Sequence, residues 1–258
     1  MTNRKLILII CFAVIFFTPI SMGVGMIFAS ISNDGAMEHV TPYVPNPTPI
    51  HWEHYDDAQD AYVKECINLG ITYDEYKASM SDGSMRLSTW FDPPGLHLVD
   101  PDNKYVKMVT EHILEVTEGY CELSRITAAL NFVQTSVEYG YDDELYGGNF
   151  TARPMETLFL QKGDCEDTSV LLMSIYLAMG YDAALFSYTG HVAVGVMYEE
   201  KWLLCETTLD MCMLPSESIR HHGEMPDIYR PGSISNTVLA INDGIGWYRN
   251  LIHDILGL

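Results

Sequence analysis

The sequence predicts an α+β fold in which one buried helix packs against an antiparallel sheet. The first observation is the run at residues 165–179, which is apolar on nearly every side, as in a helix surrounded by protein. The second is a set of three strand-like runs that follow it, joined by short polar turns, at residues 183–188, 191–198 and 202–207. A helix followed by an antiparallel meander is typical of α+β domains.

Composition limits the size of the domain and the class of its partners. The chain has 258 residues, 48% of them hydrophobic, which is enough for one main domain with additional segments. Lys and Arg number 14 against 35 Asp and Glu, so the formal net charge is −21. Nucleic acid is not expected as a partner, because binding it requires a basic surface. The acidic charge by itself names no other partner.

The N-terminal segment, residues 1–30, predicts a transmembrane helix. Residues 6–29 are uncharged and mostly apolar, and they follow Arg4 and Lys5. A helix of this length crosses a hydrocarbon core of roughly 30 Å with some tilt. The basic pair favours an N-terminus in the cytoplasm and a domain on the outer side of the membrane. The alternative is a cleaved signal peptide and a secreted protein, because small residues end the stretch.

Between the anchor and the core, the sequence predicts a stalk and a helical extension. Prolines recur without a sustained period in residues 31–56, which predicts an extended stalk. In residues 57–122 apolar side chains recur at helical spacing over two runs, 57–69 and 105–116, which predict packing helices.

The core domain is predicted over residues 123–214 and a C-terminal extension over 215–258. The core begins with a helix at 123–139, which Gly140 is expected to end, before a loop that leads to Pro154. The extension is rich in loops until its last residues, where the apolar spacing at 244–258 predicts an amphipathic helix packed on the domain.

Cysteine usage is compatible with an exported domain. Besides Cys11 in the predicted anchor there are five cysteines, and two disulfides would leave one free thiol. Sequence does not establish the connectivity. The pairing that we expect is Cys66 with Cys121 and Cys205 with Cys212.

Cys165 is the candidate nucleophile. Asp164 is suited to cap the following helix, which would place Cys165 in the first turn, where unpaired N–H groups and the helix dipole favour a thiolate. Glu166 and Asp167 lie in the same turn, and their negative charge has the opposite effect. The sequence therefore leaves the direction of the shift in the thiol pKa open.

His191 and Glu206 are the candidate base and orienting group. His191 begins the second strand, on the face that it shares with Ala193, while the alternate valines enter the core. Glu206 follows on the next strand, so a hairpin would bring its carboxylate beside the imidazole. Such a carboxylate fixes the histidine tautomer and supports the imidazolium. With a cysteine, these are the groups that nucleophilic thiol catalysis needs.

Four sequence blocks, taken in order, resemble the core of the transglutaminase-like superfamily. They are Arg153-Pro154-Met155-Glu156-Thr157-Leu158, Gly163-Asp164-Cys165-Glu166-Asp167, Gly190-His191-Val192 and Trp202-Leu203-Leu204-Cys205-Glu206-Thr207-Thr208. The resemblance spans residues 126–209 and implies a papain-like fold. It also implies a catalytic triad of Cys165, His191 and Glu206, with Glu where the family usually has Asp. Gln134 is a candidate oxyanion donor beside the Cys165 backbone N–H.

These residues predict acyl transfer or hydrolysis on amide or peptide bonds, with no cofactor and no metal. The resemblance implies a peptidase, isopeptidase, amidase or transglutaminase, which share the triad and differ in the acyl acceptor. An exported domain makes surface protein, peptide or cell-wall amide substrates the expected partners, besides the membrane that holds the anchor.

Two other classes of function remain as alternatives. One is a catalytically inactive module for binding or surface assembly. The other is a structural metal site made by Cys205, Cys212 and His221. Two further polar clusters, at residues 51–54 and around Asp142, lack a full ligand set and are expected to be solvated surface.

Overall fold

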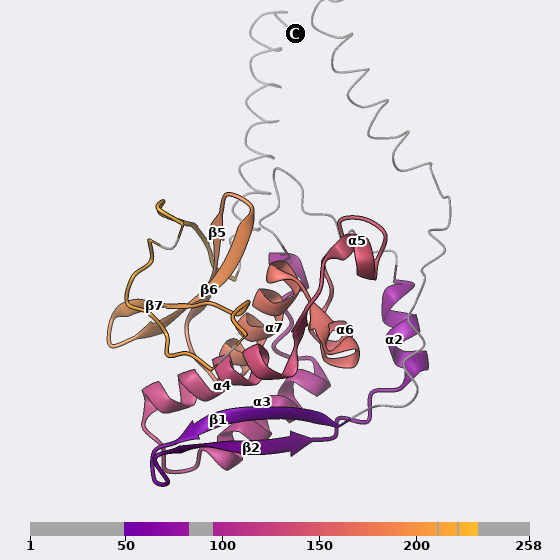
Figure 1. Ribbon diagram of the computed structural model, residues 1–258. Coiled ribbons are helices and arrows are strands. Elements are labelled where there is room, and N and C mark those ends of the chain that lie inside the picture. Colours follow the sequence, from indigo (N-terminus) through magenta and orange to yellow (C-terminus); the bar gives the residue numbers. More distant parts are fainter. Residues whose placement is uncertain (1–48, 83–94, 211, 221, 232–258) are drawn as a thin grey trace, which may run out of the picture. The chain divides into compact units, whose positions relative to one another are not determined.

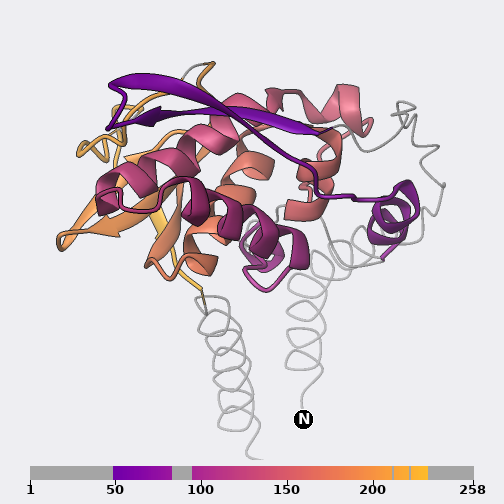
Figure 2. The same cartoon turned by 90° about the horizontal axis from the view of Figure 1, so that it is seen from below.

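The computed structural model describes residues 49–82, 95–210, 212–220 and 222–231 (Figures 1 and 2). The predicted membrane anchor and the predicted helix at 244–258 lie outside these residues. None of the helices in the described ranges combines the length and the apolar character that crossing a bilayer requires.

Helix α7 (Cys165–Ala178) is the centre of the fold and lies against a four-stranded antiparallel sheet. The strands are ordered β7-β6-β5-β8, with bounds Ala183–Tyr188 for β5, His191–Tyr198 for β6, Lys201–Cys205 for β7 and Asp227–Tyr229 for β8. Leu171, Leu172 and Ile175 of α7 are fully buried, as the uninterrupted apolar run predicts. The α+β prediction is therefore confirmed.

The sheet is buried on both faces. Val192, Val194 and Val196 of β6 belong to the main core around α7, whereas Ala193 packs on the opposite face of the sheet. This is the alternation that the sequence predicts. Gly195 also faces away from α7, and a Cβ there would lie only 2.2 Å from the ring of Phe186, which pairs with Ala193 two residues along β6. A glycine is thus required where that ring crosses β6.

The helices predicted before the core are partly confirmed. Helix α3 (Lys104–Val116) matches the run at 105–116, and α4 (Glu122–Ser136) matches most of the run at 123–139. Helix α4 ends before Gly140, because the chain turns into strand β3 (Glu138–Tyr139), which pairs in parallel with β4 (Lys162–Gly163). This pairing brings residues 138–139 beside the turn that precedes Cys165.

Residues 50–67 form a β-hairpin, so the helix predicted over 57–69 is wrong. The stalk predicted over 31–56 is also wrong for residues 50–56, which form the first strand of the hairpin. Strands β1 (Ile50–Asp56) and β2 (Ala61–Ile67) are antiparallel, and the Asp56 carboxylate accepts hydrogen bonds from the Ala58 and Gln59 N–H groups in the turn between them.

The apolar pattern of the hairpin has a period of two. Trp52 and His54 point to the same face of β1 and are each only 1% exposed, whereas His51 points to the opposite face and is exposed. The prediction of solvated surface at 51–54 is therefore wrong for Trp52 and His54 and correct for His51. The Glu53 N–H also donates to the Thr135 hydroxyl of α4 at 3.0 Å. The hairpin, α4, α7 and the sheet thus contact one another in that order (Figure 2).

Four short helices complete the described chain. They are α2 (Tyr73–Met80), the 3-10 helix η1 (Leu96–Leu98), α5 (Asp142–Leu145) and α6 (Pro154–Leu160). Helix α5 lies inside a predicted loop. Helix α6 begins with the Pro154 that the first motif block contains, and the Glu156 carboxylate accepts a hydrogen bond from the Arg153 N–H at 2.8 Å.

The predicted disulfides do not form. Cys66, Cys121, Cys165, Cys205 and Cys212 are all free thiols. Cys205 points into the core, where the Tyr176 hydroxyl lies 3.3 Å from its sulfur, while Cys212 contacts the Glu53 carbonyl at 3.6 Å. The two thiols expected to pair are therefore directed at different elements.

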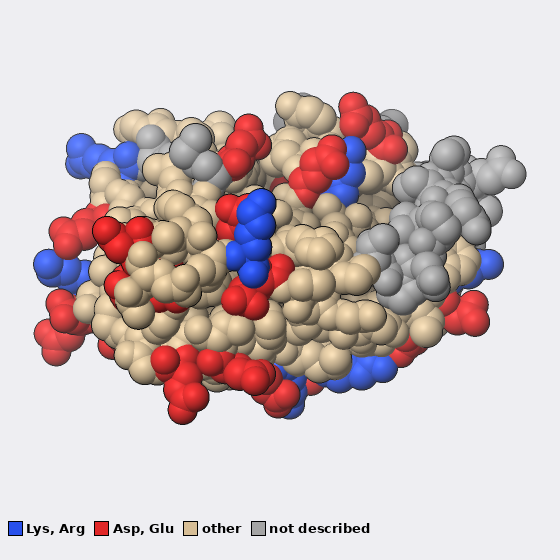
Figure 3. All heavy atoms as spheres, turned by 60° about the horizontal axis from the view of Figure 1, so that its bottom comes forward, with Lys and Arg blue, Asp and Glu red and all other residues tan. Residues whose placement is uncertain are grey.

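Acidic side chains are distributed over the surface, with basic side chains between them, on the face that Figure 3 shows. This distribution agrees with a formal charge of −21. Lys64 pairs with Glu53 at 3.1 Å and Lys107 with Asp102 at 2.8 Å, so several of the few cations are held in surface ion pairs.

Candidate active site

The turn before α7 places Cys165 at the first position of the helix. The Asp164 carboxylate accepts hydrogen bonds from the Glu166 and Asp167 N–H groups at 3.1 and 3.4 Å, and the Asp167 carboxylate accepts one from the Asp164 N–H. At Gly163, any Cβ would lie 2.7 Å from the Cβ of Asp167. The Gly-Asp-Cys-Glu-Asp block is therefore a helix start that fixes the position of the thiol.

The thiol of Cys165 is buried and hydrogen-bonded in this arrangement. Its S–H donates to the Glu166 carboxylate at 2.7 Å. Burial raises the pKa of the thiol most, the negative charge of Glu166 raises it further, and a hydrogen bond from the Val192 N–H lowers it. The net direction is strongly upward, so burial and Glu166 outweigh the helix terminus.

His191 and Glu206 meet as the sequence predicts. The His191 Nε2 atom lies 2.8 Å from Glu206 Oε2, and the other carboxylate oxygen accepts hydrogen bonds from the Thr208 N–H and hydroxyl at 3.2 and 2.8 Å. Burial raises the pKa of Glu206, but the bonds from His191 and Thr208 outweigh it and hold the pKa below its usual value. Because Nε2 is committed to Glu206, proton exchange with a thiol falls to Nδ1.

Hydrogen bonds join the start of α7 to β6, which begins with His191, and to the chain just after β7, which carries Glu206. The Ser169 hydroxyl donates to the Val192 carbonyl at 3.1 Å, and the hydroxyls of Thr168 and Thr207 are 2.8 Å apart. These contacts, together with the Val192 N–H at the sulfur, bring the three predicted residues to the same end of the α7–sheet unit.

Gln134 holds the chain that follows β7. Its Nε2 donates to the Glu206 carbonyl at 2.7 Å and its Oε1 accepts from the Met213 N–H at 3.1 Å. Gln134 therefore positions Glu206 through the backbone. Its role as an oxyanion donor stays a prediction.

A cluster of three carboxylates beside Cys165 is not evident from the sequence. Asp142 is half-buried rather than solvated surface, and it approaches Asp164 and Asp167. Burial and then the charge of Glu166 raise the pKa of Asp142 to about 6 and that of Asp164 to about 8, and burial also raises the pKa of Asp167. Asp142 is far from Cys165 in sequence, so only the folded chain reveals this proximity.

Three groups of side chains in the described ranges bring metal-ligating atoms within 4.8 Å of one another. They are His191 with Glu206 and His222, Asp164 with Cys165 and Glu166, and Asp142 with Asp164 and Asp167. The alternative of a structural metal site with Cys205 and Cys212 is not among them, and its third member, His221, lies outside the described residues.

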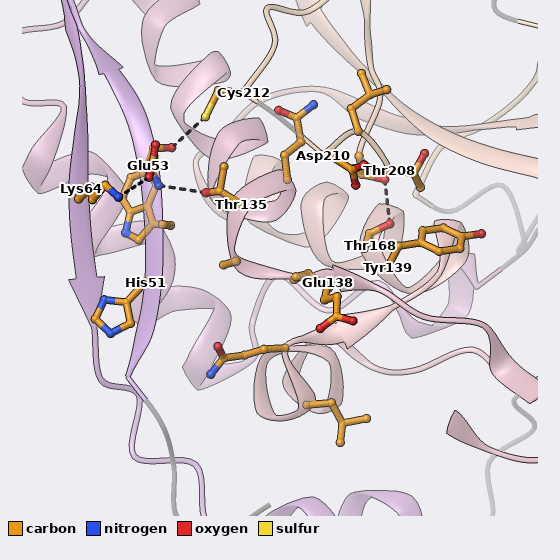
Figure 4. Close-up of a pocket in the computed structure, with 18 of the residues that line it drawn as sticks. His51, Glu53, Lys64, Thr135, Glu138, Tyr139, Thr168, Thr208, Asp210 and Cys212 are labelled. Atoms are coloured by element: carbon orange, nitrogen blue, oxygen red, sulfur yellow. Dashed lines mark hydrogen bonds and ion pairs between the residues drawn. The ribbon is translucent and has the colours of Figure 1, made fainter. Parts of the chain in front are cut away.

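A cleft of about 1120 Å³ extends from Thr168 and Thr208 toward the β1–β2 hairpin (Figure 4). At one end it is lined by Thr168 and Thr208, which contact the chain around the triad. The pKa of Tyr139, also in the lining, is raised to about 12 by burial and then by the neighbouring Cys165. The other end is lined by His51, Glu53 and Lys64. One end of the cleft thus lies close to the start of α7, because the Thr168 hydroxyl that lines it donates to the Cys165 carbonyl at 3.3 Å.

Neutralising Glu166 is expected to activate the thiol toward alkylation. The variant Glu166→Gln removes a charge that raises the thiol pKa, so more thiolate forms at a given pH. Each unit by which the pKa falls should speed alkylation at pH 8 about threefold, because the gain in thiolate is partly offset by lower nucleophilicity. Iodoacetamide labelling of Cys165, followed by mass spectrometry from pH 6 to 10, measures this effect.

The matched control is Glu118→Gln, which makes the same charge change at an exposed position after α3. Its labelling profile should match that of the unmodified chain. An unchanged or higher thiol pKa in Glu166→Gln would contradict the role of Glu166 described above.

No protein-family model matches the chain, and no curated protein matches its sequence. The solved structures that are similar to it include the following two. One is a transglutaminase, with 14% sequence identity and a TM-score of 0.33 over 55% of this chain and 34% of that protein. The other is a proposed cysteine protease from Cytophaga hutchinsonii, with 13% identity and a TM-score of 0.34 over 57% of this chain and 55% of that protein.

This chain therefore corresponds to less than two thirds of the length of either protein. The roles of individual residues depend on the geometry described above.

Proposed function

We propose that this chain catalyses thiol-dependent acyl transfer or hydrolysis on amide or peptide bonds. Cys165 is the nucleophile, His191 the general base and acid, and Glu206 the residue that orients His191. The observation that carries the proposal is the 2.8 Å contact between His191 and Glu206. Hydrogen bonds link the segments that carry these two residues to α7, the helix that begins with Cys165. Covalent catalysis needs a nucleophile, a base that activates it and a group that orients the base.

The reaction proceeds in two halves. His191 takes the thiol proton through Nδ1 while the sulfur attacks the carbonyl carbon of the amide. The C–N bond then breaks as the leaving amine takes that proton, which leaves a thioester on Cys165. Water or a second amine attacks the thioester and passes a proton to His191, and the sulfur leaves and recovers the proton. Glu206 stabilises the imidazolium in both halves.

The resting thiol is held in an unreactive form. Burial and Glu166 keep the pKa of Cys165 high, so thiolate forms only when a base accepts its proton. Substrate amide groups would reach this thiol along the cleft, past Tyr139 and Thr208. This arrangement limits side reactions of the sulfur while no substrate is bound.

We further propose that the domain acts outside the cytoplasm on protein, peptide or cell-wall amides, held to the membrane by residues 6–29. The support is the apolar segment and the basic pair before it. Protease added to intact cells should digest the domain. Protection of the domain until the cells are lysed would contradict this placement.

The first test uses the full-length chain with a glutamine-containing peptide, with and without hydroxylamine. Hydroxamate formation would identify transfer to amines, whereas release of ammonia or of new peptide ends without an amine would identify hydrolysis. Iodoacetamide should inhibit either reaction.

A catalytically inactive binding module is the second candidate, and the high pKa of the Cys165 thiol favours it. Absence of turnover on a broad panel of amides, together with slow labelling of Cys165 that His191→Ala does not change, would support this candidate and contradict catalysis.

A further inference from the structure

The segment that precedes β8 crosses the turn between β5 and β6 and is held there by side-chain contacts. The Tyr188 hydroxyl donates to the Ile219 carbonyl at 2.7 Å. On the other side of the turn, the Thr189 N–H donates to the Glu224 carboxylate at 2.7 Å. These bonds lie on either side of His222 along the segment, and they fix it over the strand that begins with His191.

His222 consequently approaches the pair of His191 and Glu206. The centroids of the two imidazole rings are 4.7 Å apart, and the rings are inclined at 70°. One ligand atom from each of the three residues lies within 4.8 Å of the others. His222 itself is exposed, so its ring has room to rotate.

We propose that His191, Glu206 and His222 form a binding site for a divalent transition-metal ion, with Zn²⁺ as the representative ion. Two imidazoles and one carboxylate, with a fourth position for water, are a ligand set that Zn²⁺ accepts. This metal site goes beyond the proposed acyl transfer, and it depends on the positions of the three side chains rather than on activity.

The observed spacing suits such an ion after small side-chain rotations. Bonds of about 2.1 Å in a tetrahedral site separate the ligand atoms by roughly 3.4 Å. The His191–Glu206 contact at 2.8 Å would open slightly, and the His222 ring would move inward. Because the metal replaces the proton between Nε2 and the carboxylate, binding needs neutral imidazoles and weakens as the pH falls.

The metal-bound form is inactive in thiol catalysis. When a metal ion binds Nε2 of His191, the one proton of the neutral ring stays on Nδ1. The ring then cannot accept the Cys165 proton and transfer it to a leaving amine. Glu206, as a ligand of the same ion, no longer supports an imidazolium. The segment around His222 therefore supplies a reversible, metal-dependent inhibition of the triad.

Metal binding is measured on the full-length chain, purified without a histidine tag, by equilibrium dialysis with Zn²⁺ and by absorption spectroscopy with Co²⁺. We expect one site per chain whose affinity falls at least tenfold in His222→Gln. The matched control is His51→Gln, at an exposed histidine of β1, which should bind like the unmodified chain. The Co²⁺ spectrum should lack the intense band of a thiolate ligand.

Equal Zn²⁺ affinity in the unmodified chain and in His222→Gln would overturn the proposal. An intense thiolate band that persists in His222→Gln would overturn it too, because it would assign the metal to cysteines. Repeating the dialysis in Cys165→Ala separates this site from the proposed catalysis, since that variant lacks the nucleophile and should still bind one metal ion.

Discussion

Replacing Cys165 with alanine is expected to lower the rate of acyl transfer about 10,000-fold or more, to the level that binding alone supports. Alanine cannot form the thioester, so the two-step path is lost. Steady-state rates of hydroxamate formation or amide hydrolysis measure the loss. Since the change also removes the buried S–H that donates to Glu166, a thermal melt should accompany the assay to show that the variant is folded.

The control for this variant is Cys66→Ala, which removes an exposed thiol on β2 and should leave the rate unchanged. Adding His191→Ala to Cys165→Ala should cause little further loss, because members of a catalytic unit act together and their effects do not add. A Cys165→Ala variant that retains a substantial part of the rate would contradict the assignment of the nucleophile.

Replacing Trp52 with alanine is expected to reduce the free energy of unfolding by about 3–5 kcal/mol. Trp52 is 1% exposed, and its indole N–H donates to the His112 ring at 3.3 Å. It also meets the Phe132 ring of α4 edge to face, with centroids 5.5 Å apart. The substitution would leave a large cavity between the hairpin and α4, and urea unfolding followed by far-UV circular dichroism measures its cost.

The matched substitution Tyr62→Ala removes an aromatic ring from the same hairpin at a side chain that is 54% exposed. Its effect should stay below about 1 kcal/mol. Similar small effects for both variants would contradict the packing of the hairpin on α4.

The negative charges beside Cys165 bear on both the proposed catalysis and the proposed metal site. Asp164 is needed to cap α7, and Glu166 accepts a hydrogen bond from the thiol, yet both carboxylates disfavour a thiolate. Reactivity therefore depends on His191. The thiol can act when His191 is able to accept its proton, and it cannot act when His191 binds a metal ion.

The sequence alone determined helix α7, the meander β5–β7 and the residues of the candidate triad. These follow from local patterns: the cap at Asp164, a run of apolar residues with no polar face, and the alternation that separates His191 from the core valines. The pairing of His191 with Glu206 also follows, because consecutive antiparallel strands joined by a short turn are neighbours.

Only the tertiary structure decided the remaining features. The run at 57–69 is compatible with a helical or a strand period, and packing of Trp52 on α4 selects the strand. Burial is the main cause that raises the thiol pKa, and the burial of Cys165 depends on the whole fold. The approach of His222 to His191 joins residues that no local pattern relates, because it arises when a loop crosses the β5–β6 turn.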